Sequence, residues 1–215
     1  MFKSNLGDDI VRIYICGPHS TGKTTLLNDL RPHIGNIKIV EEVARGIIKN
    51  HGWTRDDFLP EKHPDVFQQL NEEILAAQIE TDKKYTRLGQ DFICDRALDP
   101  MIYCGFYIGE QAKEAMYRLD GMEQWLESLR KSLVVLVSPH PECIHDDSVR
   151  LSSSIEELRE FYAKFEKELQ HNHIRYVKLT QLDRQERVHT VLKELTTFKR
   201  RKSLKPAEDE SNAVE

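Results

Sequence analysis

Residues 17–24 read Gly17-Pro18-His19-Ser20-Thr21-Gly22-Lys23-Thr24, and this stretch determines how the rest of the chain is interpreted. A glycine, four residues and then Gly-Lys-Thr form the phosphate-binding P-loop pattern. The glycines let the backbone curl so that successive N–H groups point at phosphate oxygens. Lys23 brings a positive charge to the β- and γ-phosphates, and the Thr24 hydroxyl is suited to ligate Mg²⁺. The pattern predicts a site for a nucleoside triphosphate with its metal ion, and we include the next residue, Thr25, in that site.

The residues on both sides of the motif fit the arrangement that a P-loop needs. Residues 10–16 form a short β-branched and aromatic run, which predicts a buried strand. Residues 24–30 are predicted to be helical, and Pro32 and Gly35 end that helix. Strand, glycine loop and helix in this order are the P-loop unit. An ordinary glycine-rich turn is the alternative, and the two flanks argue against it.

Composition narrows the class of protein. The chain has 215 residues, of which 39% are apolar and 31% charged, and this fits one sizeable α/β domain with a core of its own. The net charge of −5 gives no reason to expect a nucleic acid as the main partner. No apolar stretch approaches the roughly 20 residues of a membrane span. The four cysteines contain no CxxC pair, so we expect a reducing, cytoplasmic environment.

Strand and helix patterns alternate along the chain. After the first strand, further strands are predicted at residues 37–41, 91–95, 133–137 and 175–179, and longer helices at 64–88, 121–130, 155–171 and 183–199. Alternation of this kind predicts a parallel sheet with helices on both faces. The fold class is therefore a three-layer α/β sandwich of the P-loop NTPase type, with about five strands.

The chain divides into three expected parts: a leader at 1–9, the P-loop domain at 10–198 and a charged, disordered tail at 199–215. The tail begins with the basic run Lys199-Arg200-Arg201-Lys202. Cations at a helix C-terminus complement the helix dipole, and this interpretation is favoured. A nuclear localisation signal or a contact with an anionic partner is the alternative.

Glu42 and Arg45 directly follow the second predicted strand. Ligands bind at the carboxyl ends of strands in open α/β sheets. On a helical turn the two residues share a face, and a carboxylate there is suited to orient or deprotonate an acceptor hydroxyl. A surface ion pair between them is the alternative.

The third predicted strand ends in Asp95-Arg96. An acid at such a strand end lies beside the Mg²⁺ of a P-loop, which makes Asp95 the best metal-side acid. Arg96 is suited to contact a phosphate or an acceptor, and Asp99 and Tyr103 share a face with Asp95 if a helix follows. Alternatively, Asp95 only caps that helix.

A polar loop at residues 139–153 follows the fourth predicted strand and has the composition of a mobile lid. An arginine that swings over the γ-phosphate stabilises the charge that develops there, and Arg150 is the candidate for this role. The loop also contains His140, Cys143 and His145, but their spacing matches no standard zinc pattern.

Taken together, the segments Gly17–Leu26, Glu42–Arg45 and Asp95–Arg96, followed by Asp99, Tyr103 and a late Val149-Arg150, resemble the NadR/TRPL-translocation-defect-type AAA domain. This P-loop family is close to the ribosylnicotinamide-kinase domain of NadR and to nucleoside kinases. The resemblance spans residues 10–198. It implies a kinase-like sheet with strand order 2-3-1-4-5, a flexible lid, and binding of a nucleoside triphosphate with Mg²⁺.

By matched position, the resemblance implies that Lys23 and Thr24 contact the phosphates and Mg²⁺ and that Asp95 lies near the metal. Glu42 and Arg45 would lie on the acceptor side, and Arg150 would lie in the lid.

Two function classes use such a site. The first is a kinase-like transfer of phosphate from ATP, or from GTP, to a small nucleoside-like acceptor. The second is a nucleotide-binding regulatory switch or slow NTPase that acts through a protein partner. A scaffold whose P-loop only stabilises the fold is a third, weaker interpretation.

Overall fold

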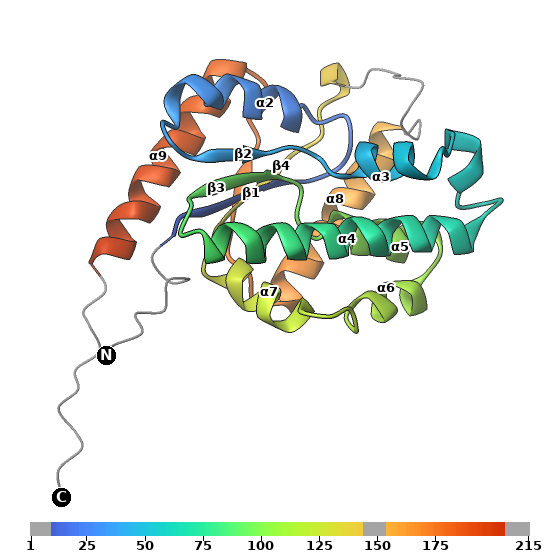
Figure 1. Ribbon diagram of the computed structural model, residues 1–215. Helices are drawn as coiled ribbons and strands as arrows, with labels where there is room; N and C mark the ends of the chain where they lie inside the picture. The colour runs from blue at the N-terminus through green and yellow to red at the C-terminus, as the bar shows by residue number, and fades with distance from the viewer. Residues whose placement is uncertain (1–9, 144–153, 205–215) are drawn as a thin grey trace, which may run out of the picture.

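A five-stranded parallel sheet in the order β2-β3-β1-β4-β5 forms the centre of the computed structural model, which describes residues 10–143 and 154–204 (Figure 1). The strands are β1 (Arg12–Cys16), β2 (Lys38–Val40), β3 (Phe92–Asp95), β4 (Leu133–Val137) and β5 (Tyr176–Leu179). Every residue of the three central strands is buried, as expected for hydrophobic runs covered on both faces. The predicted fold class and strand order are confirmed.

One face of the sheet is covered by α2 (Lys23–Leu30) and α9 (Arg184–Ser203). Both helices lie on the same side of the sheet in Figure 1. Leu26 and Leu30 of α2 and Val191 of α9 pack with the β1 residues Ile13 and Ile15 in one buried cluster. The helix after the P-loop is therefore fixed to the sheet by its own apolar face.

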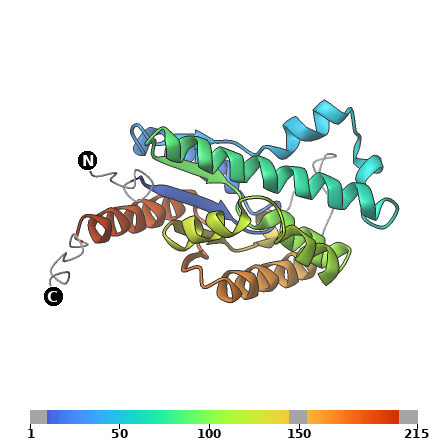
Figure 2. The ribbon, with the colours of Figure 1, turned by 60° about the horizontal axis from the view of Figure 1, so that its bottom comes forward.

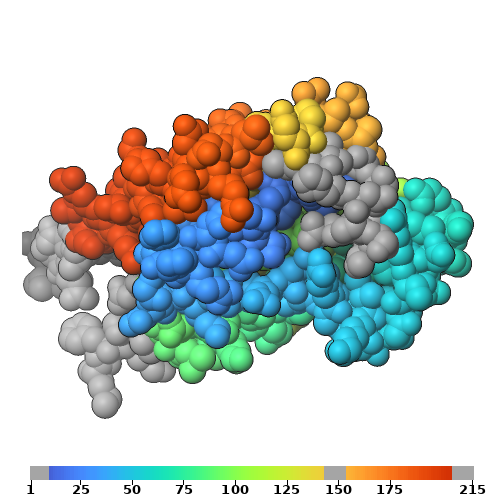
Figure 3. Space-filling view, turned by 90° about the horizontal axis from the view of Figure 1, so that it is seen from above, coloured from blue at the N-terminus to red at the C-terminus, as the bar shows by residue number. Residues whose placement is uncertain are grey.

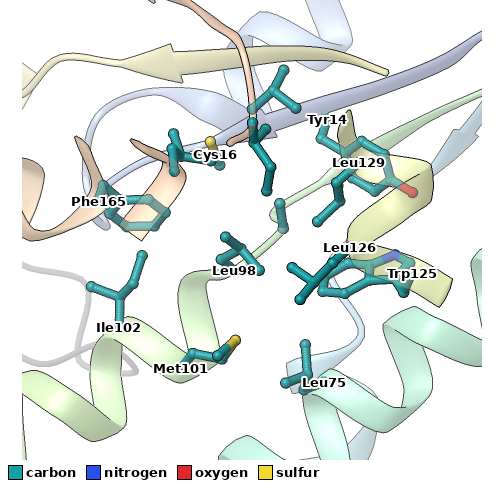
Figure 4. Close-up of a cluster of buried hydrophobic side chains, with 14 of the residues drawn as sticks. Tyr14, Cys16, Leu75, Leu98, Met101, Ile102, Trp125, Leu126, Leu129 and Phe165 are labelled. Carbon is teal, nitrogen blue, oxygen red and sulfur yellow. The ribbon is translucent and has the colours of Figure 1, made fainter. Parts of the chain in front are cut away.

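The opposite face carries a larger cluster, which Figure 4 shows from inside. It joins the sheet residues Tyr14 and Cys16 to Leu75, Trp125 and Phe165 on three different helices. The helices of this side, which comes forward in Figure 2, are α4 (Pro64–Arg87), α5 (Asp99–Tyr107), α6 (Glu110–Met116), α7 (Met122–Arg130) and α8 (Ile155–His171). None of the helices in the described residues is long and apolar enough to span a bilayer.

Most elements lie where the sequence predicts them, with ends that differ by a few residues. The predicted helix at 183–199 continues to Ser203, so the first residues of the expected tail are helical. The short α3 (Ala44–His51), α5 and α6 were not among the predicted long helices. Only Ala112 and Met116 of α6 are buried, so its apolar pattern was too sparse to recognise. Three short 3₁₀ helices complete the described elements: η1 (Arg31–His33), η2 (Arg55–Phe58) and η3 (Pro141–Cys143).

Gly17 is required by the packing of the P-loop on the sheet. Its φ is +132°, a conformation that other residues rarely adopt. A Cβ atom at this position would lie 2.6 Å from the carbonyl oxygen of Val137, the last residue of β4. The first glycine of the motif therefore lets the loop pass directly over the end of the neighbouring strand.

Candidate nucleotide and acceptor site

The P-loop connects the end of β1 to the first turn of α2. Gly22 precedes the helix in a left-handed conformation with φ +82°, and Ser20 also has a positive φ of +57°. The Thr21 hydroxyl donates a hydrogen bond to the carbonyl oxygen of Pro18 at 2.9 Å. The loop is therefore held by its own contacts before any ligand binds.

Lys23 is buried at the centre of the loop. Its Nζ donates hydrogen bonds to the carbonyl oxygens of Gly17 at 2.7 Å and Pro18 at 2.6 Å. Burial, together with the nearby charge of Arg96, lowers the pKa of Lys23 to about 8, although neighbouring carboxylates act in the opposite direction. The lysine thus changes its charge close to neutral pH.

We expect the affinity for ADP to fall as the pH rises above about 8, the pKa of Lys23 in the ligand-free protein. The phosphates attract the protonated amine, so binding above this pH requires uptake of a proton. The loss approaches about tenfold per pH unit for a single linked proton. Calorimetric titrations between about pH 7 and about pH 9.5 measure this loss of ADP affinity. Lys23→Ala is the control, and its ADP affinity should depend less on pH. An unchanged slope in that variant would contradict the assignment to Lys23.

Asp95 lies at the end of β3 beside the first turn of α2. Its Oδ2 accepts a hydrogen bond from the Thr24 hydroxyl at 2.9 Å, and the strand register pairs it with Ile15 of β1. Its Oδ1 is buried and has no hydrogen-bond partner among the described residues. A buried carboxylate oxygen without a partner is costly, and a cation would remove that cost. Thr24 and Asp95 therefore fit a Mg²⁺ site, in which most of the other ligands come from water and phosphate.

Arg96 organises the polar residues next to Asp95. Its Nε donates to Glu42 Oε1 at 2.7 Å, and its Nη1 donates to Asp99 Oδ1 at 3.1 Å. The guanidinium also lies 6.0 Å from the centre of the Tyr103 ring. Arg96 has a φ of +85°, an uncommon conformation for a non-glycine residue, which costs on the order of 1–3 kcal/mol. The predicted site residues are therefore brought together around one strained arginine.

The alternative roles of Glu42 and Asp95 find no support in these contacts. Glu42 is largely buried and accepts a hydrogen bond from Arg96, 54 positions away in the sequence. The cap residue of α5 is Leu98, and Asp95 contacts Thr24 instead.

Asp99 is completely buried. Burial raises its pKa above the usual range, and the charges of Arg96 and Lys23 offset part of that rise. Burial also raises the pKa of Tyr103 to about 12, so its hydroxyl stays protonated at neutral pH.

A pocket opens next to these polar residues, and we call it the α3–α4 pocket. Its polar part contains the predicted residues Glu42, Arg45, Arg96, Asp99 and Tyr103, together with the P-loop residue His19 and with Asn71; its mostly apolar wall is formed by Ala44, Ile48, Phe58, Phe67, Leu70, Ile74 and Pro100. No pattern in the sequence predicts this wall. The helical periodicity of α4 indicated a buried face, but it could not show that part of that face lines a pocket.

Another pocket lies on the other side of the P-loop, and we call it the α2–α9 pocket. It is lined by Gly22, Thr25, Leu26, Asp29, Glu142, Leu182, Arg184 and Arg187. Leu182 is 45% exposed and contributes apolar surface to this pocket. Nothing in the sequence pattern singles out Arg184 or Arg187. Arg150 lies outside the described residues, as do positions 144–153 of the expected lid.

Comparisons with known proteins agree with this architecture. A family model described as an AAA domain (AAA_28) matches residues 12–187, whereas no curated protein matches the chain. Among solved structures, NadR in complex with NR superposes with a TM-score of 0.69 at 18% identity, covering 90% of this chain and 53% of that one. This chain therefore spans about half the length of NadR.

Two other solved kinases have the same fold. Deoxyadenosine kinase from M. mycoides gives a TM-score of 0.59 at 15% identity, covering 87% of this chain and 100% of that chain. Shikimate kinase from Acinetobacter baumannii gives a TM-score of 0.53 at 17% identity, covering 88% of this chain and 95% of that chain. The resemblance seen in the sequence is thus confirmed at the level of the fold, which is that of a P-loop kinase. The family model covers most of the chain, and we conclude that the chain belongs to this AAA domain family.

Proposed function

We propose that this protein transfers the γ-phosphoryl group of ATP, or of GTP, to a hydroxyl group of a small nucleoside-like acceptor in a Mg²⁺-dependent reaction. Three of the solved neighbours are a deoxyadenosine kinase, a shikimate kinase bound to shikimate, and NadR bound to NAD and AMP-PNP. These neighbours support the class of reaction, while the site of this chain supports the choice of acceptor.

One observation carries the proposal: the P-loop contributes to pockets on both of its sides. Gly22 and Thr25 line the α2–α9 pocket, and His19 lines the α3–α4 pocket. A nucleotide whose phosphates occupy the loop would place its nucleoside in the α2–α9 pocket and turn its terminal phosphate towards the α3–α4 pocket. A switch needs only the nucleotide pocket, whereas a kinase also needs a place for its acceptor.

Thr24 and Asp95 are the residues that would hold Mg²⁺, because their oxygens lie together at the end of the P-loop. Mg²⁺ bound there would neutralise charge on the β- and γ-phosphates. Lys23 would add its positive charge once it exchanges the backbone carbonyl oxygens for phosphate oxygens. Both groups stabilise the charge that builds up as the terminal phosphate is transferred.

Glu42 is suited to receive the proton of the acceptor hydroxyl. Its side chain is only 16% exposed, lines the α3–α4 pocket and is fixed by Arg96. In the transfer, the acceptor oxygen bonds to the γ-phosphorus, the bond to the bridging oxygen breaks, and the proton passes to Glu42. The nucleoside diphosphate leaves with the electrons of the broken bond.

The apolar wall of the α3–α4 pocket supports an acceptor with a flat or apolar part. Phe58 and Phe67 face this pocket together with the amide of Asn71, whose Nδ2 donates to the Phe67 carbonyl at 2.8 Å. A nucleoside has such a shape, with an aromatic base at one end and hydroxyl groups at the other. Its base would contact the aromatic wall while a hydroxyl meets Glu42.

A panel of nucleosides and small hydroxylated acids, assayed for acceptor-dependent release of ADP or GDP, tests this function. We expect Glu42→Gln to lower kcat for the best acceptor by about 10²-fold or more, since loss of a general base has effects of this size. The glutamine can still accept the hydrogen bond from Arg96, so the local structure should persist.

Glu41→Gln is the matched control, because the neighbouring Glu41 side chain is 82% exposed and, within the described part of the chain, pairs only with Arg31. It should have wild-type activity. If no acceptor raises the release of diphosphate above the acceptor-free rate, the kinase proposal fails. A conformation that differs between bound diphosphate and triphosphate would then favour the regulatory switch.

A further inference from the structure

Arg187 is a buried arginine that the proposed reaction does not yet use. It lies in the first turn of α9 and is only 4% exposed. Arginine is rarely buried to this extent unless an opposite charge pairs with it and acceptors bind its hydrogen-bond donors. Its surroundings therefore indicate what it does.

The guanidinium of Arg187 joins two loops that are distant in the sequence. Its Nη1 donates to the carbonyl oxygen of Thr21 in the P-loop at 2.8 Å, and its Nε donates to the carbonyl oxygen of Gln181 at 2.6 Å. Gln181 lies in the loop between β5 and α9, next to the exposed Leu182. Arg187 thus fixes the distance between the phosphate loop and the loop that forms the other side of the α2–α9 pocket.

The charge of Arg187 has no anionic partner among the described residues. Both of its hydrogen-bond acceptors are neutral carbonyl groups, and its Nη2 is buried with no partner there. Two of the described carboxylates line the same pocket. Arg184 holds Asp29 with two hydrogen bonds of 2.9 and 2.6 Å, and Glu142 forms no ion pair with Arg187. A buried cation of this kind is stabilised by an anionic ligand.

We propose that Arg187 is a positioning residue for the nucleoside end of the bound nucleotide. It holds the β5–α9 loop against the P-loop, and its Nη2, which has no partner among the described residues, is available to donate a hydrogen bond to an oxygen of the sugar that enters the α2–α9 pocket. Figure 3 shows the atoms of α9 beside those of α2 on this face of the molecule, and the two helices are in contact. The inference rests on the proposed function for the identity of its ligand, a nucleoside triphosphate.

The test compares two probes, ADP and pyrophosphate, by calorimetry on the full chain. Pyrophosphate occupies the phosphate loop but lacks the nucleoside end. We expect Arg187→Met to weaken ADP binding at least about tenfold and to leave pyrophosphate binding within about twofold. If Arg187→Met does not fold, Arg187→Lys, which keeps the charge but cannot reach both carbonyl groups, should show the same selective loss at about threefold or more.

Two control variants separate positioning from general stability. Val188→Ala removes buried contacts of the neighbouring residue and should lower the unfolding temperature without changing the ratio of the two affinities. Arg200→Met removes an exposed arginine of the same helix and should change neither quantity.

Parallel losses for both probes in the Arg187 variants, or no loss for either, would overturn the inference. A wild-type protein that binds neither probe would overturn it as well. A wild-type protein that binds ADP but phosphorylates no acceptor would defeat the proposed function, and the selective loss in Arg187→Met would still support this assignment.

Discussion

Asp95→Asn should leave the protein folded and lower the rate of phosphoryl transfer by roughly 10²–10³-fold, as expected when a charge-stabilising contact of the transition state is lost. The asparagine has the same shape, but it replaces a carboxylate oxygen with an amide group and removes the negative charge. Oδ1 of Asp95 is buried without a hydrogen-bond partner in residues 10–143 and 154–204, while Oδ2 accepts a hydrogen bond from Thr24. The variant therefore loses the group that fits a Mg²⁺ ligand and keeps the packing.

Rates measured over a range of Mg²⁺ concentrations check this expectation, because weaker metal binding shifts the dependence to higher concentrations. Asp91→Asn is the matched control. Asp91 directly precedes the same strand, and its Oδ1 accepts a hydrogen bond from the Val11 backbone at 2.7 Å, away from the site. Normal activity in Asp95→Asn would remove Asp95 from the mechanism.

Lys23→Ala should lower the affinity for ATP and ADP by about tenfold to a hundredfold, since a hydrogen bond to a charged group contributes roughly 1.5–3 kcal/mol. The ammonium group now binds the carbonyl oxygens of Gly17 and Pro18, close to where phosphate oxygens would lie. Without it, the loop keeps its backbone donors but loses its central charge. Fluorescence titration with a labelled nucleotide measures the change.

Lys193→Ala, which removes an exposed lysine of α9, should bind nucleotide like the wild type. If Lys23→Ala also retained full affinity, the P-loop would serve only to stabilise the fold. That result would favour the scaffold interpretation over both the kinase and the switch.

The sequence predicted the sheet well, because its strands carry their own signal. Residues 133–137 are continuously apolar and all buried, as expected for a strand that is covered on both faces of the sheet. The edge strand β2 is harder to delimit from sequence. Among the described strands it pairs only with β3, and its three residues are at least partly exposed. It is shorter than the predicted 37–41 segment.

The polar centre of the site could also be predicted, for a geometric reason. Lys23, Glu42 and Asp95 follow three strands whose carboxyl ends meet at one edge of a parallel sheet. Arg187 could not be found in this way, because it contacts a residue 166 positions earlier through the packing of α9 on α2. The wall of the α3–α4 pocket was missed for a similar reason, since apolar helix residues look alike whether they face a core or a ligand.

Gly17 bears on how this motif changes during evolution. Its missing side chain makes room for the Val137 carbonyl oxygen, so this glycine serves the assembly of the sheet and not only the approach of a phosphate. A descendant that lost nucleotide binding would be free to replace Lys23 while selection for folding still kept Gly17. The two ends of the motif are therefore constrained for different reasons, packing on the sheet at Gly17 and charge at Lys23, and the lysine is the better marker of retained chemistry.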